Sequence, residues 1–167
     1  MREGTGSMTA GLALIDKCIG ALGALELGLA MKMSRVNVEQ MVLARKAADP
    51  KAAAASFLRS RYYKAWSRAQ LNNTEYAPML CVLMLLIRVK ASRTGRSLCA
   101  MERISCVGSV MSSLVFVYAV ATQGKVDVAN MRPGQAGMSP LRPLGALTRY
   151  AAMAGLVWCA ARDDSAD

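Results

Sequence analysis

The sequence predicts an all-α membrane protein in which four transmembrane helices form one bundle. The 167-residue chain is 54% hydrophobic but only 5% aromatic, whereas a soluble domain of this size fills its core with larger aromatic and branched side chains. Its apolar residues are mainly Ala, Leu, Met, Val and Gly, and small residues let membrane helices approach closely. Helix formers dominate throughout, and the alternating β-branched runs typical of strands are absent.

Four apolar stretches define the expected helices. The first covers 9–33 and is interrupted by charged residues. The second, 77–87, is short and needs the amphipathic turns before it to cross a bilayer. The third, 104–122, is uncharged and long enough to span by itself. The fourth, 144–161, contains a single charge, Arg149. Because the third stretch alone passes a strict hydropathy test, a soluble or peripheral Ala-rich helical bundle remains an alternative.

Turn-forming residues separate these stretches. Asp49-Pro50 breaks the chain after the first, the segment 92–96 follows the second, and the Gly- and Pro-containing segment 123–140 follows the third. We therefore expect one domain over residues 1–167, with helices at about 9–47, 57–90, 98–123 and 141–161.

A charged and amide-rich cluster at 68–80 runs without a loop into the second apolar stretch. At about 100° per residue, its members Arg68, Asn72, Glu75 and Tyr76 share one arc of a helix, and Gln70 points the opposite way. Polar groups beside a membrane-like run are expensive to bury, and they indicate a partner, a ligand or a water-filled cavity. The plain alternative is a solvated face of an amphipathic helix.

Arg68-Ala-Gln70-x-Asn72-x-x-Glu75-Tyr76-x-Pro78 resembles the second-helix signature of the MAPEG family, the membrane-associated proteins in eicosanoid and glutathione metabolism. Two weaker similarities flank it: Leu43-Ala-Arg45-Lys46 resembles the end of the family's first helix, and the segment 142–150 resembles the start of its fourth. Members of that family are trimers of four-helix transmembrane subunits that bind glutathione between neighbouring subunits. The resemblance thus implies a homotrimer with glutathione as co-substrate.

The resemblance also implies roles for individual residues. Gln70 and Arg45 would contribute from the neighbouring subunit, and Tyr118 would replace a ligand-contacting tyrosine unless it is simply an interfacial aromatic. The arginine that activates the glutathione thiol would be Arg142, with Arg132 as the second choice. The residues expected to bind glutathione are Arg45, Arg68, Gln70, Asn72, Glu75, Tyr76 and Tyr118.

The polar arc has chemistry that matches this ligand. Glutathione carries two carboxylates, an amine and a thiol; arginines clamp carboxylates, and a carboxylate such as Glu75 holds an amine. A guanidinium stabilises the thiolate, which is the nucleophilic form. The expected reaction is addition of the thiolate to a lipophilic electrophile, or reduction of a lipid hydroperoxide, and it requires no metal.

The third helix departs from the family pattern. Active members commonly carry an Arg or His there, followed by tyrosines, but this chain has Ser109, Ser112 and Ser113 near those places. Ala65 also stands where the second helix of active members often has a cation. The alternative function is therefore a catalytically inactive MAPEG-like structural or assembly subunit of a larger membrane complex.

The composition of the chain argues against several other classes of function. The net charge is +10, yet the basic residues are scattered among apolar stretches without interleaved aromatics, so nucleic-acid binding is not expected. The chain has no His and no Cys-x-x-Cys spacing, which argues against zinc and dithiol motifs. Cys99, near Arg96 and Arg103, is the one weak candidate for a reactive thiol.

The expected partners are the lipid bilayer, glutathione, a lipophilic substrate and either two further copies of the chain or the neighbouring subunits of a membrane complex. The expected location is multi-pass in an endoplasmic reticulum, mitochondrial or plastid membrane. No cleavable signal is apparent, and whether residues 1–7 are native or processed is open, with Met8 as an alternative start.

Overall fold

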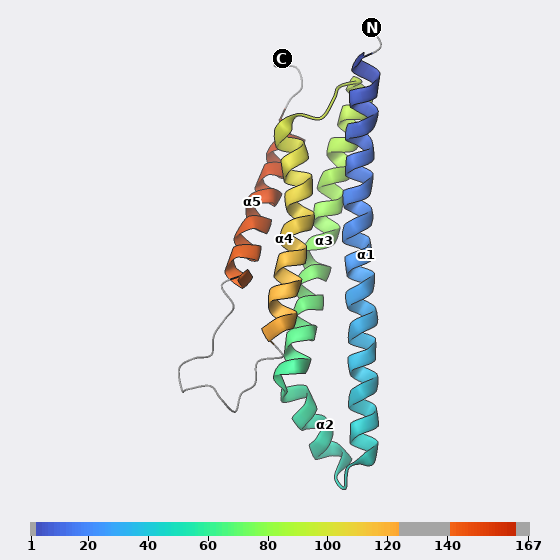
Figure 1. Ribbon diagram of the computed structural model, residues 1–167, viewed down its shortest axis with the longest axis vertical. Coiled ribbons are helices and arrows are strands. Elements are labelled where there is room, and N and C mark those ends of the chain that lie inside the picture. The colour runs from blue at the N-terminus through green and yellow to red at the C-terminus, as the bar shows by residue number, and fades with distance from the viewer. Residues whose placement is uncertain (1–2, 124–140, 163–167) are drawn as a thin grey trace.

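The computed structural model describes residues 3–123 and 141–162, and in these ranges the chain is all-helical with no strand. The long helices run alongside one another, and a lower extension is formed by the end of α1, by α2 and by the start of α3 (Figure 1). This confirms the predicted helical class. The helices are α1 (Glu3–Lys46), α2 (Pro50–Arg59), α3 (Arg61–Thr94), α4 (Ala100–Gln123) and α5 (Leu141–Ala161).

The described residues contain five helices, whereas the sequence predicted four. Asp49-Pro50, read from the sequence as a break, starts the additional helix α2, because the Asp49 carboxylate accepts hydrogen bonds from the backbone N–H groups of Lys51 and Ala52, both at 3.0 Å. Ser60 has an extended backbone that ends α2, and its hydroxyl accepts from the Tyr63 N–H at 3.2 Å to start α3. The predicted second helix at 57–90 is therefore divided at Ser60.

The inner face of α3 is a stripe of mostly small residues at spacings of three and four. This spacing keeps one side of a 3.6-residue helix against its neighbours. The helix continues through Pro78 and ends at Gly95, whose φ of 66° lies in the left-handed region that glycine adopts without strain. The buried residues of α3 are Ala65, Ala69, Asn73, Ala77, Leu80, Met84, Ile87 and Ala91.

Two apolar clusters hold the helices together. The upper cluster joins all four long helices through residues such as Ile15, Leu80 and Leu156. The second cluster lies lower, where Phe116 of α4 packs with Ala69 of α3. Below this level α2 has no buried residue. The polar cluster at 68–80 therefore spans the levels of both apolar clusters, because Ala69 belongs to the lower cluster and Ala77 and Leu80 belong to the upper one.

Helices α4 and α5 are in especially close contact. A Cβ added to Gly145 would lie 2.9 Å from the backbone N and 3.0 Å from the Cα of Phe116, so only glycine fits there. Farther along α5, a Cβ on Gly155 would meet the Ser105 hydroxyl of α4. Small residues that let two backbones approach in this way are typical of helix pairs in membranes.

Two of the charges that interrupt the first apolar stretch, Asp16 and Glu26, are paired with α3. Arg88 donates to both carboxylate oxygens of Asp16, at 2.7 and 3.2 Å. The Glu26 carboxylate accepts from the Asn73 side chain at 2.7 Å and from the Thr74 hydroxyl at 2.5 Å. Pairing lowers the cost of placing such groups in an apolar bundle, so α1 and α3 carry polar residues that their neighbours satisfy.

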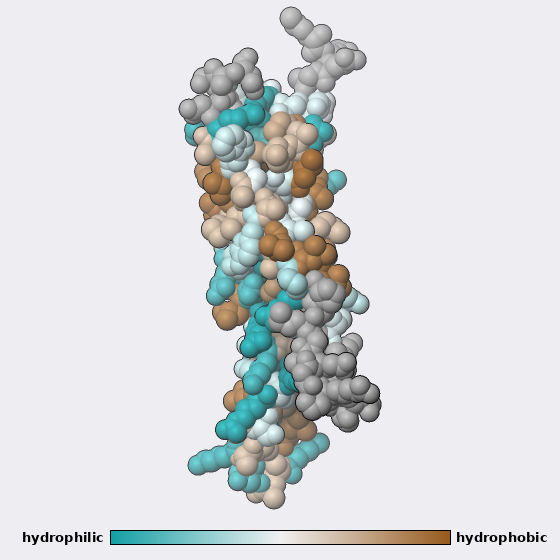
Figure 2. Space-filling model, turned by 90° about the vertical axis from the view of Figure 1, so that its left-hand side faces the viewer, coloured by the Kyte–Doolittle hydropathy of each residue, from teal (hydrophilic) through white to brown (hydrophobic). Residues whose placement is uncertain are grey.

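The surface of the bundle is strongly apolar. Figure 2 shows a band of hydrophobic residues over the upper half, with hydrophilic residues above it and along the narrow lower part. Two helices are long and apolar enough to cross a membrane, over Ala100–Thr122 and Leu141–Ala161. The accessible surface is 10550 Å², compared with about 8000 Å² for a compact monomer of this mass. Large hydrophobic residues such as Ile104, Leu147 and Trp158 are exposed, and such a surface is suited to contact with lipid or with other subunits.

Candidate functional site

The predicted polar arc lies on a part of α3 that the other described residues leave partly exposed. Arg68 and Glu75 are exposed, and Asn72 and Tyr76 are half-buried. Within the described residues, the structure gives Arg68, Asn72 and Glu75 no side-chain hydrogen bond or ion pair. The arc therefore presents a cation, an amide and a carboxylate whose hydrogen-bonding capacity is unused within the described residues.

Arg149 of α5 is the buried charge beside this arc. Its residue is only 2% exposed, and neither its Nε nor its Nη2 has a hydrogen-bond partner in the described residues. The guanidinium lies over two rings, with its Cζ 4.7 Å from the centroid of Phe116 and 5.4 Å from that of Tyr76. Cation–π contacts of this kind contribute about 0.5–2 kcal/mol each. They leave the N–H groups in the plane of the guanidinium unused.

A pair of tyrosines joins α3 to α5 next to Arg149. The hydroxyls of Tyr76 and Tyr150 are hydrogen-bonded at 2.9 Å, and their rings meet edge to face with centroids 5.8 Å apart. Tyr150 is exposed, so this pair stands between the buried guanidinium and the surface. Tyr76 thus contacts both the buried cation and the rest of the arc.

The register between α3 and α5 places Arg142 at the level of Arg68. The two helices run in the same direction (Figure 1), and Tyr76 contacts Tyr150. Arg68 precedes Tyr76 by eight residues, as Arg142 precedes Tyr150, so each arginine lies about 12 Å down its helix from the tyrosine pair. The second choice for the activating arginine, Arg132, lies outside the described residues.

Gln70 and Arg45, the two residues expected to contribute from a neighbouring subunit, lie at different heights along the bundle. Gln70 is half-buried on the side of α3 opposite the arc, next to the Thr74 hydroxyl that faces α1. Arg45 is exposed in the last turn of α1, about 28 Å beyond the level of Glu26, whereas Arg68 lies only about 8 Å below that level. Rotation about a trimer axis parallel to the helices leaves the height of a residue unchanged. Arg45 of a neighbouring subunit would therefore lie about 20 Å below the level of Arg68.

The third-helix candidates do not join the arc within the chain. Tyr118 is 62% exposed and lies about 200° around α4 from Phe116, the residue that contacts Arg149. Ser109 and Ser113 are buried and donate to carbonyl groups of their own helix, at 2.7 and 2.8 Å. The hydrogens of these hydroxyls are therefore already used within α4.

Sequence reasoning did not include Arg149 or Tyr150 among the site residues. The available signal was that Arg149 is the one charge in an otherwise uncharged apolar stretch, a position where an ionisable residue indicates function. The contact with Tyr76 depends on how α5 packs, which local spacing does not determine.

No protein-family model, curated protein or solved structure matches this chain.

Proposed function

We propose that this chain is an integral membrane protein that binds glutathione on the polar arc of α3. The observation that carries the proposal is the combination of Arg68, Asn72 and Glu75, which have no partner in the described residues, with the buried Arg149 beside them, whose Nε and Nη2 have no hydrogen-bond partner there. An isolated buried charge is costly, and an anionic ligand would offset that cost.

The groups on the arc complement those of glutathione. The Arg68 guanidinium can hold a carboxylate through two parallel hydrogen bonds. The Glu75 carboxylate can accept from the ligand amine, and the Asn72 amide can donate or accept. Arg142 lies as far along α5 from the tyrosine pair as Arg68 lies along α3, and we propose that its guanidinium approaches the other carboxylate or the thiol of the bound ligand.

We further propose that Arg149 assists the chemistry together with Arg142. A thiol with an unperturbed pKa of about 8.5 is mostly protonated at neutral pH, and a nearby guanidinium favours its thiolate because the guanidinium does not lose its proton. Movement of the exposed Tyr150 side chain would admit the ligand sulfur to the unused N–H groups of Arg149. The thiolate would then displace a leaving group from a lipophilic electrophile. In the peroxidase form, two glutathione molecules reduce ROOH to ROH and water and become glutathione disulfide.

The membrane setting of the proposal extends to the whole bundle. Helices α4 and α5 have the required length and composition, and Asp16 and Glu26 of α1 are paired with side chains of α3. We propose that all four long helices cross the bilayer and that three copies associate through the exposed apolar faces. Carbonate extraction of membranes tests the first point: recovery of the chain in the soluble fraction would contradict it.

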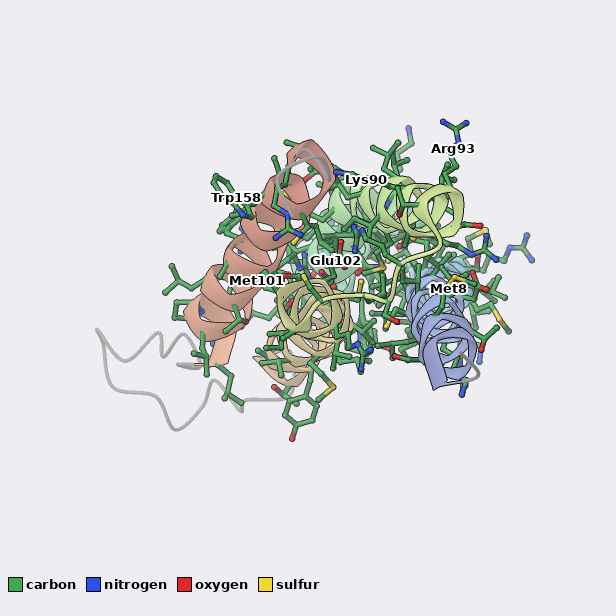
Figure 3. All side chains as sticks on the ribbon, turned by 90° about the horizontal axis from the view of Figure 1, so that it is seen from above. Met8, Lys90, Arg93, Met101, Glu102 and Trp158 are labelled. Carbon is green, nitrogen blue, oxygen red and sulfur yellow. The ribbon has the colours of Figure 1, made fainter. Side chains whose placement is uncertain are left out.

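Titration of purified protein with glutathione tests the binding site. Arg68→Ala and Glu75→Ala should each weaken binding by about 10-fold or more, because each removes a charge-assisted hydrogen bond of about 1.5–3 kcal/mol. Arg93→Ala is the matched control, since Arg93 is an exposed arginine near the other end of the same helix (Figure 3). Unchanged affinity in both arc variants, with the fold intact, would exclude the site.

A structural subunit without activity is the second candidate. The outward position of Tyr118 and the locally satisfied serines of α4 favour it, because the third-helix part of the ligand shell is not assembled within the chain. Conjugation of glutathione to a generic electrophile by the purified protein would exclude this alternative. Binding without turnover would support it.

A further inference from the structure

Two cysteines from different helices meet at the upper end of the bundle. Cys99 immediately precedes α4, and Cys159 lies in the last turn of α5. The sulfur atoms of both and a carboxylate oxygen of Glu102 all lie within 4.8 Å of one another. Figure 3 looks down on this end, with Glu102 in the interior of the bundle and Trp158 on its outer side.

Arg96 holds the carboxylate of this cluster in place. It donates from Nη1 and Nη2 to the two oxygens of Glu102, at 2.9 and 2.7 Å. The backbone N–H of Cys99 donates to the same carboxylate at 2.8 Å. The start of α4 is thus fixed by a buried ion pair, and Cys99 is held at a defined position beside Cys159.

The hydrogen bonds of Glu102 argue against a metal ion at this cluster. Both oxygens of Glu102 are already engaged, and a guanidinium lies against them, which opposes a second cation. Cys99 is half-exposed whereas Cys159 is 6% exposed. This asymmetry suits a pair in which one thiol meets a reagent from solution and the other, protected thiol resolves the product.

We propose that Cys99 and Cys159 are a redox-active pair that a small organic disulfide oxidises to an intramolecular disulfide. This inference is independent of the glutathione site on α3. The sulfur atoms need to approach from within 4.8 Å to about 2.05 Å for the bond to form. Arg103, whose Nε donates to the Leu98 carbonyl at 3.1 Å, adds positive charge that favours an anionic disulfide such as glutathione disulfide.

The reaction proceeds by two exchanges. The Cys99 thiolate attacks one sulfur of the disulfide RSSR, forms Cys99–S–S–R and releases RS⁻. The Cys159 thiolate then attacks the Cys99 sulfur, forms the Cys99–Cys159 bond and releases a second RS⁻. The two thiol protons end on the two released molecules of RSH. Two protein thiols are oxidised, and one disulfide is reduced.

Counting thiols tests the proposal. Detergent-purified full-length protein is treated with excess glutathione disulfide, alkylated with a maleimide and analysed by mass spectrometry. The five cysteines should fall to three alkylated sites, with one peptide pair joined through Cys99 and Cys159. Cys159→Ser should stop at a mixed disulfide on Cys99, and Cys99→Ser should not react. Cys81→Ser, on α3, should still form the disulfide.

Three outcomes would overturn the inference. The first is a wild-type protein that keeps all five thiols under these conditions. The second is a Cys99→Ser protein that loses two thiols as readily as the wild type. The third is stoichiometric Zn²⁺ binding that protects both thiols of the untreated protein, which would make the cluster a metal site instead.

Discussion

Replacement of the buried arginine should separate stability from ligand binding. In the ligand-free protein, two N–H-bearing atoms of Arg149 are buried without partners, and each such group costs about 1–3 kcal/mol. The two ring contacts offset about 0.5–2 kcal/mol each. At the middle of these ranges the two unpaired groups cost about 4 kcal/mol and the two ring contacts return about 2.5 kcal/mol, so the guanidinium destabilises the ligand-free fold by about 1–2 kcal/mol.

Arg149→Met removes that cost and keeps an apolar chain of similar length. We expect the variant to unfold about 2–8 °C higher than the wild type in the absence of ligand. Glutathione affinity should fall about 10- to 150-fold, the equivalent of one lost charge-assisted hydrogen bond of about 1.5–3 kcal/mol. Arg149→Lys should retain part of the affinity, because it keeps the charge but not the planar fork.

The assay is thermal unfolding in detergent, followed by intrinsic fluorescence across a glutathione titration, because ligand binding raises the unfolding temperature by mass action. Arg93→Met is the control and should change neither quantity, since it replaces an exposed arginine far from the arc. An Arg149→Met protein that unfolds at a lower temperature, with glutathione affinity unchanged, would refute the reasoning and assign Arg149 a purely structural role.

Two further predictions concern the helix contacts and use the same unfolding assay. Gly145→Ala should destabilise the protein by about 1–3 kcal/mol because the new Cβ meets the backbone of Phe116. Gly155→Ala should cost less, because its Cβ meets the Ser105 hydroxyl, which can rotate away. Equal losses of stability in the two variants would contradict the packing of α4 on α5. Glu26→Ala leaves the Asn73 amide unpaired and should cost about 1–3 kcal/mol. Glu26→Gln should be neutral or stabilising, because its amide can also donate to Asn73 Oδ1, which has no partner among the described residues. A loss equal to that of Glu26→Ala would argue against this bond.

The helical class and most helix boundaries could be predicted because they depend on local sequence. Residues 98–123 and 141–161 were expected as helices, and α4 and α5 occupy nearly those ranges. Helix α2 was missed because its Ala-rich segment lacks a long apolar run and because Asp49-Pro50, read as a break, is equally suited to begin a helix. An Asp-Pro pair can therefore mark either a loop or the start of a helix, and packing against α1 and α3 selects the helix.

The candidate site was predictable only in part. Membership of the arc at Arg68, Asn72, Glu75 and Tyr76 follows from helical periodicity, which the sequence contains in full. Its use for glutathione remains a proposal. The contact between the Arg149 guanidinium and the Tyr76 ring was not predictable, because it depends on the packing of α5.

The sequence by itself determined that this chain is helical, that it carries enough apolar surface to favour a membrane, and that one helix gathers polar groups on an arc. The tertiary structure decided which charges are satisfied. Asp16 is paired with Arg88, 72 residues away, whereas Arg149 is buried without a hydrogen-bond partner on Nε or Nη2 in the described residues. Pairing of distant charges is a property of helix packing, so no local pattern in the sequence distinguishes a satisfied charge from an unsatisfied one.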